Sequence, residues 1–406
     1  RGGTSPCRAT RHLAIHQTTM FSNFARKVGR PLASSARQMS TCDVVLVGCG
    51  VPGRGMGWYH ALQILEGQVP SAKLTDVVEP WFMGGGASGP GGAEFAEFKA
   101  KYEPQGVKFH ESIGAMDKAA GKKMAMICTR TADMPKFFSE VIENGCTHIF
   151  LEKPGAPTVG ELEMMANKAK DAGVGTYMGF NKNVTKYVTK GREALAKVNS
   201  PGHFTLVHHN AYKKSELGEC FERNAEGLLK NMAIHELALL TSFFGVTADN
   251  LKSITADASY SSFQTLKGPS SGKDFSDFDK IGFTIETASG DVLTVKADRC
   301  GGEMPGGAMA DGAMMYAAVE AGGVLHERAI MPDPDLLEAV KEREAANPGL
   351  MPYFYLQHDD YITLKERCCK AIIDGVEPDG IATLQIGIDT LKLAESLKPI
   401  LEKQLL

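Results

Sequence analysis

Short apolar runs alternate with helix-like stretches over the first 180 residues. The pattern between the runs, for example at 135–144, repeats apolar residues at helical spacing. The apolar runs lie at 43–47, 74–78, 107–110, 124–128, 147–151 and 175–181. Strands alternating with helices in this way predict a parallel sheet with helices on both faces.

The pattern changes beyond about residue 185. Longer strands are predicted at 204–207, 253–260, 280–287 and 292–297, and the turn at Ser289-Gly290 joins the last two as a hairpin. A helix spanning about 225–244 is apolar on most of its surface and should be largely buried. These elements predict a second domain with a mostly antiparallel sheet and flanking helices.

A glycine-rich turn follows the first predicted strand. It reads GCGVPG from Gly48 to Gly53, and a helical pattern follows at 58–65. In a strand, turn and helix unit, the first glycine permits a tight turn, the second lets the backbone approach a pyrophosphate, and the third lets helix and strand pack closely. The candidate dinucleotide-binding residues of this turn are Gly48, Gly50, Val51, Pro52 and Gly53.

The fold class predicted from these patterns is α/β plus α+β. Residues 43–180 would form an N-terminal Rossmann domain, and residues 181–406 a C-terminal α+β domain. Arg54, directly after the turn, fits equally a place near phosphate or a solvated surface position.

An acidic residue ends the second predicted strand. Glu79 at this position can accept hydrogen bonds from the adenosine ribose and would repel a 2′-phosphate; otherwise it is a carboxylate facing water. No Arg or Lys follows before Lys99, so NAD is favoured over NADP. The glycine-rich segment 84–92 either covers the adenosine end of the cofactor or is a surface insertion.

The run at 147–151 ends in Glu152, Lys153 and Pro154. A lysine beside the nicotinamide places positive charge where an alkoxide develops as hydride leaves. Glu152 would anchor either the cofactor ribose or Lys153, and Pro154 fits a preceding cis peptide bond.

The buried helix at 225–244 carries a second polar cluster. Asn231 and His235 are four residues apart and would be neighbours on one line of the helix. Polar groups in such a helix need partners or a cleft, so His235 is either satisfied by a carbonyl or faces a cleft between two domains. The cleft is favoured, where histidine is a suitable base near neutral pH.

Over about residues 43–400 the chain resembles the glucose–fructose oxidoreductase and inositol dehydrogenase family, called Gfo/Idh/MocA. The segment 152–154 is its most specific part, and the segment 231–235 is similar to the family's aspartate-x-x-x-histidine. The other matching positions are Gly179, Phe180 and Asn181, and the closing helix with Ile381, Leu384, Ile388 and Leu391.

The resemblance implies a two-domain dehydrogenase in which NAD lies across the Rossmann sheet and substrate contacts the nicotinamide. Lys153 would contact the reacting hydroxyl and His235 would take its proton. Asn231 stands where the family usually has aspartate, and an amide orients but cannot accept the proton. Residues assigned by position are Thr129 for the cofactor, and Asn181 and Lys230 for the substrate.

The predicted function is NAD-dependent oxidation of a hydroxyl-bearing carbon on a sugar, cyclitol or related polyol. Two alternatives remain open: a glycosidase-type hydrolase that uses NAD transiently, and a non-catalytic NAD-binding sensor or regulator. As in relatives, a homodimer or homotetramer is expected. The stretch 301–315 fits either a lid over the pocket or an insertion.

Composition narrows the class of protein. With 406 residues, 43% apolar and 23% charged, the chain has ordinary globular composition, and it lacks the run of about eighteen apolar residues that spans a membrane. Nine cysteines without a CxxC pair indicate neither a disulfide framework nor a structural zinc site, so a reducing compartment and no metal are expected. No membrane or nucleic-acid partner is predicted.

Charge is concentrated at the N-terminus. Residues 1–42 hold seven Arg or Lys and no Asp or Glu. Because the formal net charge of the whole chain is −4, the remaining residues carry a net charge of about −11. From Met20 the segment is Arg- and Ser-rich, as in organelle transit peptides. We therefore expect 1–42 to be a targeting or disordered segment, with mitochondrial import, Met20 as the start and 1–19 untranslated or misassigned. A cytoplasmic location and a basic arm are the alternatives.

Overall fold

The computed structural model describes residues 40–198, 202–302 and 314–406. Most of the segment predicted for targeting, residues 1–39, lies outside the described part of the chain. The same holds for residues 303–313, the centre of the stretch predicted as a lid or insertion.

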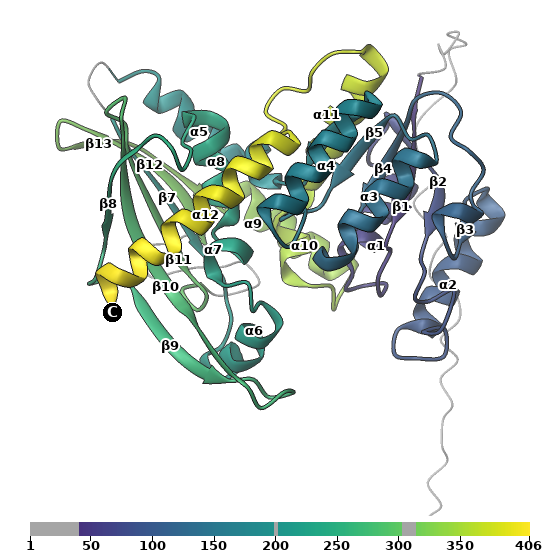
Figure 1. The fold of residues 1–406 in the computed structure, drawn as a ribbon, viewed down its shortest axis with the longest axis horizontal. Helices are drawn as coiled ribbons and strands as arrows, with labels where there is room; N and C mark the ends of the chain where they lie inside the picture. The colour runs from purple at the N-terminus through teal and green to yellow at the C-terminus, as the bar shows by residue number, and fades with distance from the viewer. Residues whose placement is uncertain (1–39, 199–201, 303–313) are drawn as a thin grey trace, which may run out of the picture. The chain divides into compact units, whose positions relative to one another are not determined.

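Six parallel strands form the first sheet, in the order β3-β2-β1-β4-β5-β6 (Figure 1). Successive residues of β1 point to opposite faces: Val45 and Val47 join one buried cluster, and Val44 and Leu46 the other. This is the pattern of a sheet covered on both sides. The strands are β1 (Cys42–Val47), β2 (Ala72–Val78), β3 (Lys108–His110), β4 (Lys123–Ile127), β5 (His148–Leu151) and β6 (Gly175–Met178).

Helices cover both faces of this sheet, as predicted. One cluster gathers side chains of α1, α2 and α11 against the strands, and the other gathers those of α3, α4 and α12. Helix α11 reaches β1 and β2 from far along the sequence. The bounds are α1 (Met56–Leu65), α2 (Gly92–Tyr102), α3 (Met134–Glu143), α4 (Val159–Ala172), α11 (His358–Asp374) and α12 (Leu384–Leu405).

The second sheet has the order β13-β12-β7-β11-β10-β8, with β9 paired to β10. Its pairs are antiparallel except β7 with β11, which run parallel. The expected mostly antiparallel sheet is therefore confirmed. The strands are β7 (His203–His209), β8 (Leu251–Ala256), β9 (Ser262–Lys267), β10 (Asp274–Thr287), β11 (Val292–Asp298), β12 (Met315–Ala321) and β13 (Val324–Met331).

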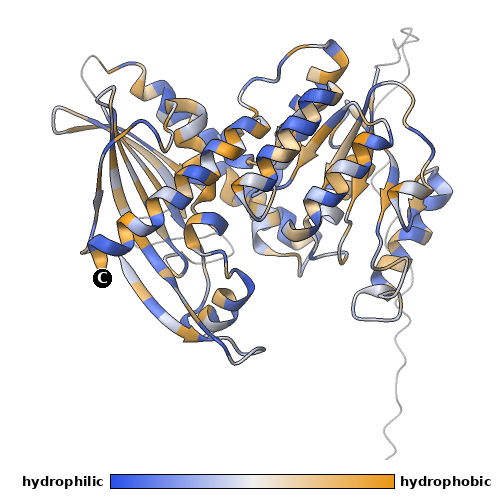
Figure 2. Cartoon of the chain, viewed as in Figure 1, coloured by the Kyte–Doolittle hydropathy of each residue, from blue (hydrophilic) through white to orange (hydrophobic). Residues whose placement is uncertain are grey.

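Helices α8 and α12 pack on each other near this sheet, and α12 also reaches β8 and α4. Figure 2 shows alternating hydrophilic and hydrophobic residues along α12. The remaining helices are α5 (Lys186–Leu195), α6 (Leu217–Arg223), α7 (Leu228–Asn231), α8 (Ile234–Phe244), α9 (Pro334–Ala346) and α10 (Pro352–Leu356). Single 3-10 turns are η1 (Glu103–Gln105), η2 (Ile113–Ala115), η3 (Thr131–Asp133), η4 (Asn181–Val184) and η5 (Lys214–Glu216).

The prediction of a single helix at 225–244 is wrong, because this segment forms two helices, α7 and α8. The carbonyl oxygen of Leu228 accepts hydrogen bonds from both Met232 N and Ala233 N, so the ladder slips by one residue between them. Asn231 and His235 consequently do not lie on one line of a single helix.

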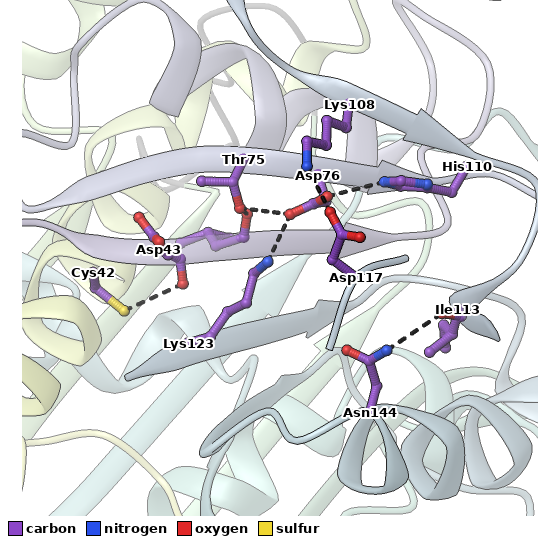
Figure 3. A network of polar contacts seen from close by, with 11 residues as sticks. Cys42, Asp43, Thr75, Asp76, Lys108, His110, Ile113, Asp117, Lys123 and Asn144 are labelled. Carbon is purple, nitrogen blue, oxygen red and sulfur yellow. Dashed lines mark hydrogen bonds and ion pairs between the residues drawn. The ribbon is translucent and has the colours of Figure 1, made fainter. Parts of the chain in front are cut away.

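A polar network joins three strands of the first sheet (Figure 3). The Asp76 carboxylate on β2 accepts a hydrogen bond from Lys123 Nζ on β4 at 2.6 Å, and its other oxygen lies 2.9 Å from His110 Nε2 on β3. Asp76 is 5% exposed, so the network holds a buried carboxylate in the sheet.

Among the described residues, no helix has the length and apolar character needed to cross a membrane.

Candidate active site

The glycine turn after β1 needs its glycines for two different reasons. Gly48, Gly50 and Gly53 all have φ between +70° and +85°, a conformation that other residues rarely adopt. At Gly48 a Cβ would also lie 2.6 Å from Thr129 Cγ2. The turn is therefore tight, as predicted.

The packing role predicted for Gly53 belongs to Gly57. A Cβ on Gly53 would meet nothing nearer than 4.0 Å, whereas one on Gly57 would lie 2.0 Å from the carbonyl oxygen of Gly48. The reason is that the turn is longer than the motif implies: α1 begins only at Met56, so the close approach of helix and strand comes one turn later.

Glu79 is buried and faces the glycine turn. Its side chain accepts hydrogen bonds from Gly50 N at 2.9 Å and from Trp81 N at 3.1 Å, and the residue is 5% exposed. It is not a carboxylate facing water. The adjoining cavity, of about 650 Å³, is lined by Gly48, Gly50, Val51, Glu79, Pro80, Trp81, Phe82, Pro90, Cys128, Thr129, Arg130, Asp133 and Phe137.

Two predicted features meet in this cavity. Pro90 brings part of the glycine-rich segment 84–92 to its wall, and Thr129 brings in the loop after β4. Gly48, Glu79 and Thr129 all follow carboxyl ends of neighbouring parallel strands, where open α/β sheets bind ligands. Arg54 is exposed and does not line the cavity.

A second cavity, of about 390 Å³, shares the segment 128–130 with the first. It brings together Glu152, Lys153, Asn181, Asn231 and His235, which the sequence placed in the site. Its other lining residues are Met56, Thr131, Met134, Gly179, Lys182, His208, Asn210, Met232, Tyr353, Gln357 and Tyr361. Adjoining cavities of this kind suit a cofactor and the molecule that reacts with it.

Lys153 is held at the wall of the second cavity. The Lys153–Pro154 peptide bond is cis, as predicted. Its Nζ donates a hydrogen bond to the backbone carbonyl of Asn231 at 3.0 Å. Burial lowers the pKa of Lys153, while the carboxylates of Glu152 and Glu226 raise it in part. The ammonium is therefore easier to deprotonate than an exposed lysine.

His235 reaches the same cavity from α8. Burial, with the positive charges of Lys153 and Lys182, holds its pKa well below the usual value. The ring is therefore neutral near pH 7 and has a lone pair to accept a proton. Among the described residues, nothing forms a hydrogen bond with its buried Nδ1. A satisfied structural histidine does not describe this ring.

The Asn231 side chain does not orient His235. Its Nδ2 donates to Asn224 Oδ1 and to Glu226 Oε1, both at 3.0 Å. Asn231 contributes to the site instead through its backbone carbonyl, which accepts the hydrogen bond from Lys153.

Lys230 turns away from the cavity. Its Nζ forms an ion pair with Glu395 on α12 at 2.7 Å, and it does not line the pocket, so its predicted contact with substrate is not supported. Asn181 does line the pocket and donates from Nδ2 to Gln357 Oε1 at 2.8 Å, while its buried Oδ1 has no hydrogen-bond partner within the described chain.

Sequence reasoning missed a buried ionic group behind His235. The Glu236 carboxylate accepts from Lys182 Nζ at 2.5 Å and lies 3.0 Å from His208 Nδ1. Burial would raise the pKa of Glu236, but His208 and Lys182 outweigh burial and hold it well below its usual range. An acidic residue next to His235 in an apolar helix was a sequence signal for this ionic group. The contact with His208 on β7 could not be predicted from residue spacing.

Comparison with known proteins gives one family match. Residues 87–180 match the model of an oxidoreductase family with an NAD-binding Rossmann fold, GFO_IDH_MocA. No curated protein sequence matches the chain.

Solved structures show the same fold over most of the chain. A probable dehydrogenase from Thermotoga maritima is 16% identical with a TM-score of 0.63, covering 89% of this chain and 97% of that one. A putative myo-inositol dehydrogenase from Sinorhizobium meliloti 1021 is 18% identical with a TM-score of 0.61, covering 89% and 98%.

An oxidoreductase from Agrobacterium radiobacter, in complex with NAD+, L-tartaric acid and magnesium, is 11% identical with a TM-score of 0.62, covering 90% and 96%. These structures confirm the fold, and the match over 87–180 is to a family with an NAD-binding Rossmann fold. Residues 87–180 are therefore similar to the NAD-binding Rossmann part of the Gfo/Idh/MocA oxidoreductases, in agreement with the resemblance seen in the sequence.

Proposed function

We propose that the protein is an NAD-dependent dehydrogenase that oxidises a hydroxyl-bearing carbon of a sugar, cyclitol or related polyol. One observation carries the proposal: Lys153 and His235 line one cavity that shares segment 128–130 with the cavity of the dinucleotide turn. A cation and a neutral imidazole thus face the place where a substrate would meet the cofactor.

The residues of the first cavity fit NAD. Gly48 and Gly50 line the cavity with backbone alone, which suits the approach of a pyrophosphate, and the buried Glu79 offers carboxylate oxygens to ribose hydroxyls while disfavouring a 2′-phosphate. Bound NAD+ would supply the hydride acceptor. Thr129 lines both cavities and Glu152 lines the second, so both are placed to contact the nicotinamide half.

The proposed mechanism divides the work between two side chains. Lys153 binds the substrate hydroxyl oxygen and stabilises the negative charge that develops on it. His235, neutral at physiological pH, takes the hydroxyl proton on a ring nitrogen. The carbonyl of Asn231 holds Lys153 in place, and Asn181 offers its free Oδ1 to a substrate hydroxyl.

The lining of the second cavity supports a polyhydroxylated substrate. Its polar groups come from Asn181, Lys182, His208, Asn210 and Gln357, which provide both hydrogen-bond donors and acceptors. Such a wall suits hydroxyl groups better than an apolar substrate.

The experiment is NAD reduction, followed by the absorbance of NADH, with a panel of aldoses, inositols, amino sugars and dihydrodiols. The proposal expects sustained NADH formation with at least one class. Release of a leaving group without net NADH would indicate the hydrolase instead. NAD binding without turnover of any panel member would indicate the sensor.

The cellular location and the oligomeric state of the protein are also proposals. We propose mitochondrial import of the precursor, supported by the Arg- and Ser-rich composition from Met20 onwards, and assembly as a homodimer or homotetramer. Fractionation of cells and light scattering of the purified protein test these two proposals.

A further inference from the structure

A buried line of polar groups leads from the second cavity to the interface of α1 and α11. Glu152 Oε1 lies 2.9 Å from His60 Nε2, and His60 Nδ1 lies 3.0 Å from Lys365 Nζ. Lys365 also donates to Gln63 Oε1 at 2.6 Å. His60 and Lys365 are 0% exposed, and the proposed mechanism uses neither of them.

The geometry fixes the direction of these hydrogen bonds. An ammonium has only donors, so Lys365 donates to Nδ1 of His60, which leaves the ring proton on Nε2. That Nε2–H then donates to the carboxylate of Glu152. Carboxylate, neutral imidazole and ammonium therefore form one relay with no net charge.

We propose that His60 and Lys365 are positioning residues, which hold the Glu152 carboxylate through this relay and change the charge beside Lys153 when Lys365 gains or loses a proton. This inference rests on the proposed function for its catalytic consequence. The relay itself, and its titration, can be tested without any substrate.

The proton can leave through the relay itself. As Nζ–H of Lys365 passes to Nδ1 of His60, Nε2–H passes to Oε1 of Glu152, and the carboxyl proton leaves to the cavity that Glu152 lines. Only N–H and O–H bonds break and form, and no electrons are transferred. The relay then carries one net negative charge, and Nε2 of His60, now without a proton, no longer donates to Glu152.

Burial places this titration in the physiological range. Burial lowers the pKa of Lys365 to about 7, against smaller opposing effects that begin with Cys128 and Glu152. Burial, with the charge of Lys365, lowers the pKa of His60 to about 4, so the imidazole stays neutral while Lys365 titrates. The groups that face Lys365 are Cys128, Glu152 and His60 from other segments, and His358, Tyr361, Cys368 and Cys369 on its own helix.

The sign of the effect on Lys153 follows from charge. The Glu152 carboxylate raises the pKa of Lys153. While Lys365 is an ammonium, its charge offsets that carboxylate; once Lys365 is neutral, Lys153 meets an uncompensated negative charge and holds its own proton more tightly. The other charged groups around Lys153 are Glu226 and Lys182, and the neutral ring of His235 is a further titratable group beside it.

The first measurement is the titration of lysines labelled with ¹³C at Cε in the full chain. One lysine should titrate near pH 7 in the wild type, and Lys365→Met should remove that signal. Glu152→Gln and His60→Gln should shift it to lower pH, because each weakens the relay that stabilises the ammonium. Lys123→Met, which removes a half-buried lysine on β4 that pairs with Asp76, should leave it unchanged (Figure 3).

The second measurement is the pH profile of kcat/KM. The wild type should show an inflection near pH 7 between two plateaus roughly tenfold apart, the effect of about 1.4 kcal/mol. Lys365→Met should lose the inflection and stay at the high-pH plateau, and Lys365→Arg, always charged, should stay at the low-pH plateau. His60→Gln should move the inflection to lower pH, in step with the lysine titration.

The results separate the inference from the proposed function. A lysine titration near pH 7 that responds to Glu152→Gln supports the relay even if no substrate turns over. The absence of that titration, or a kcat/KM profile whose inflection survives in Lys365→Met while only the Tm falls, overturns the inference and leaves the dehydrogenase intact.

Discussion

Replacing Lys153 by methionine tests the proposed chemistry at its centre. Methionine keeps the length and the apolar stem of the side chain and removes the ammonium. Lys153 is partly buried in the wall of the second cavity, where its charge faces little competing water. The variant also leaves the carbonyl of Asn231 without its hydrogen-bond donor.

The expected loss follows from that setting. Removing one preorganised donor at a developing oxyanion raises the barrier by about 2.7–4 kcal/mol, which lowers kcat about 10²- to 10³-fold. Stability should change little, because losing a charge that is unfavourable to bury offsets the unmet carbonyl, which is worth about 1–3 kcal/mol. Binding of NAD should be nearly unchanged, since the glycine turn and Glu79 are intact.

The assay is steady-state NADH formation with the best substrate of the panel, beside calorimetric titration of NAD. Lys168→Met, which removes a surface lysine paired with Glu143, is the matched control and should retain full activity. Full turnover by Lys153→Met would remove the lysine from the mechanism. A loss explained wholly by weaker NAD binding would make its role one of cofactor binding.

Four further predictions follow from the same structure. Glu79→Gln should weaken NAD binding about tenfold, or about 1.4 kcal/mol, and should reduce the difference between the affinities for NAD and NADP, both measured by calorimetry. Unchanged affinity for both cofactors would contradict the role of Glu79. Gly57→Ala should destabilise the fold by about 3 kcal/mol or more, since its Cβ would lie 2.0 Å from a carbonyl oxygen; the control Gly160→Ala, with nothing within 4 Å, should not. The free energy of unfolding should fall as pH drops from 6.5 towards 4, by up to about 3 kcal/mol from His60 alone, because its lowered folded-state pKa of about 4 lets the unfolded chain take up the proton first; denaturant melts of the wild type and His60→Gln at each pH check this, and an equal pH dependence in both would refute it. Lys230→Met should leave KM within about twofold, because its ammonium pairs away from the cavity; a large rise in KM would restore it to the substrate site.

Much of the first domain could be predicted from sequence because its signals are local. The apolar strands, the glycine turn and the segment 152–154 each lie within a few residues and dictate their own conformation. Strand ends then bring Glu79 and Lys153 to one edge of the sheet by topology alone.

Long-range packing decided the features that sequence reasoning missed. Gln357 and Tyr361 enter the cavity because the chain returns from the second sheet to the first, which no periodicity indicates. The slip in the helix at Met232 depends on where Leu228 is anchored: its N–H donates to Asp277 on the distant β10 at 2.8 Å. In the sequence, Lys365 is only a polar residue within an apolar helix pattern. Its contacts with His60 and Gln63 arise because α1 packs against α11.

The most direct test of the central claim is a crystal structure of the protein with NADH and myo-inositol. The account predicts one inositol hydroxyl within hydrogen-bond distance of both Lys153 Nζ and a His235 ring nitrogen, with its carbon against the reactive face of the nicotinamide. An inositol bound elsewhere, or a nicotinamide that points away from these two side chains, would contradict it.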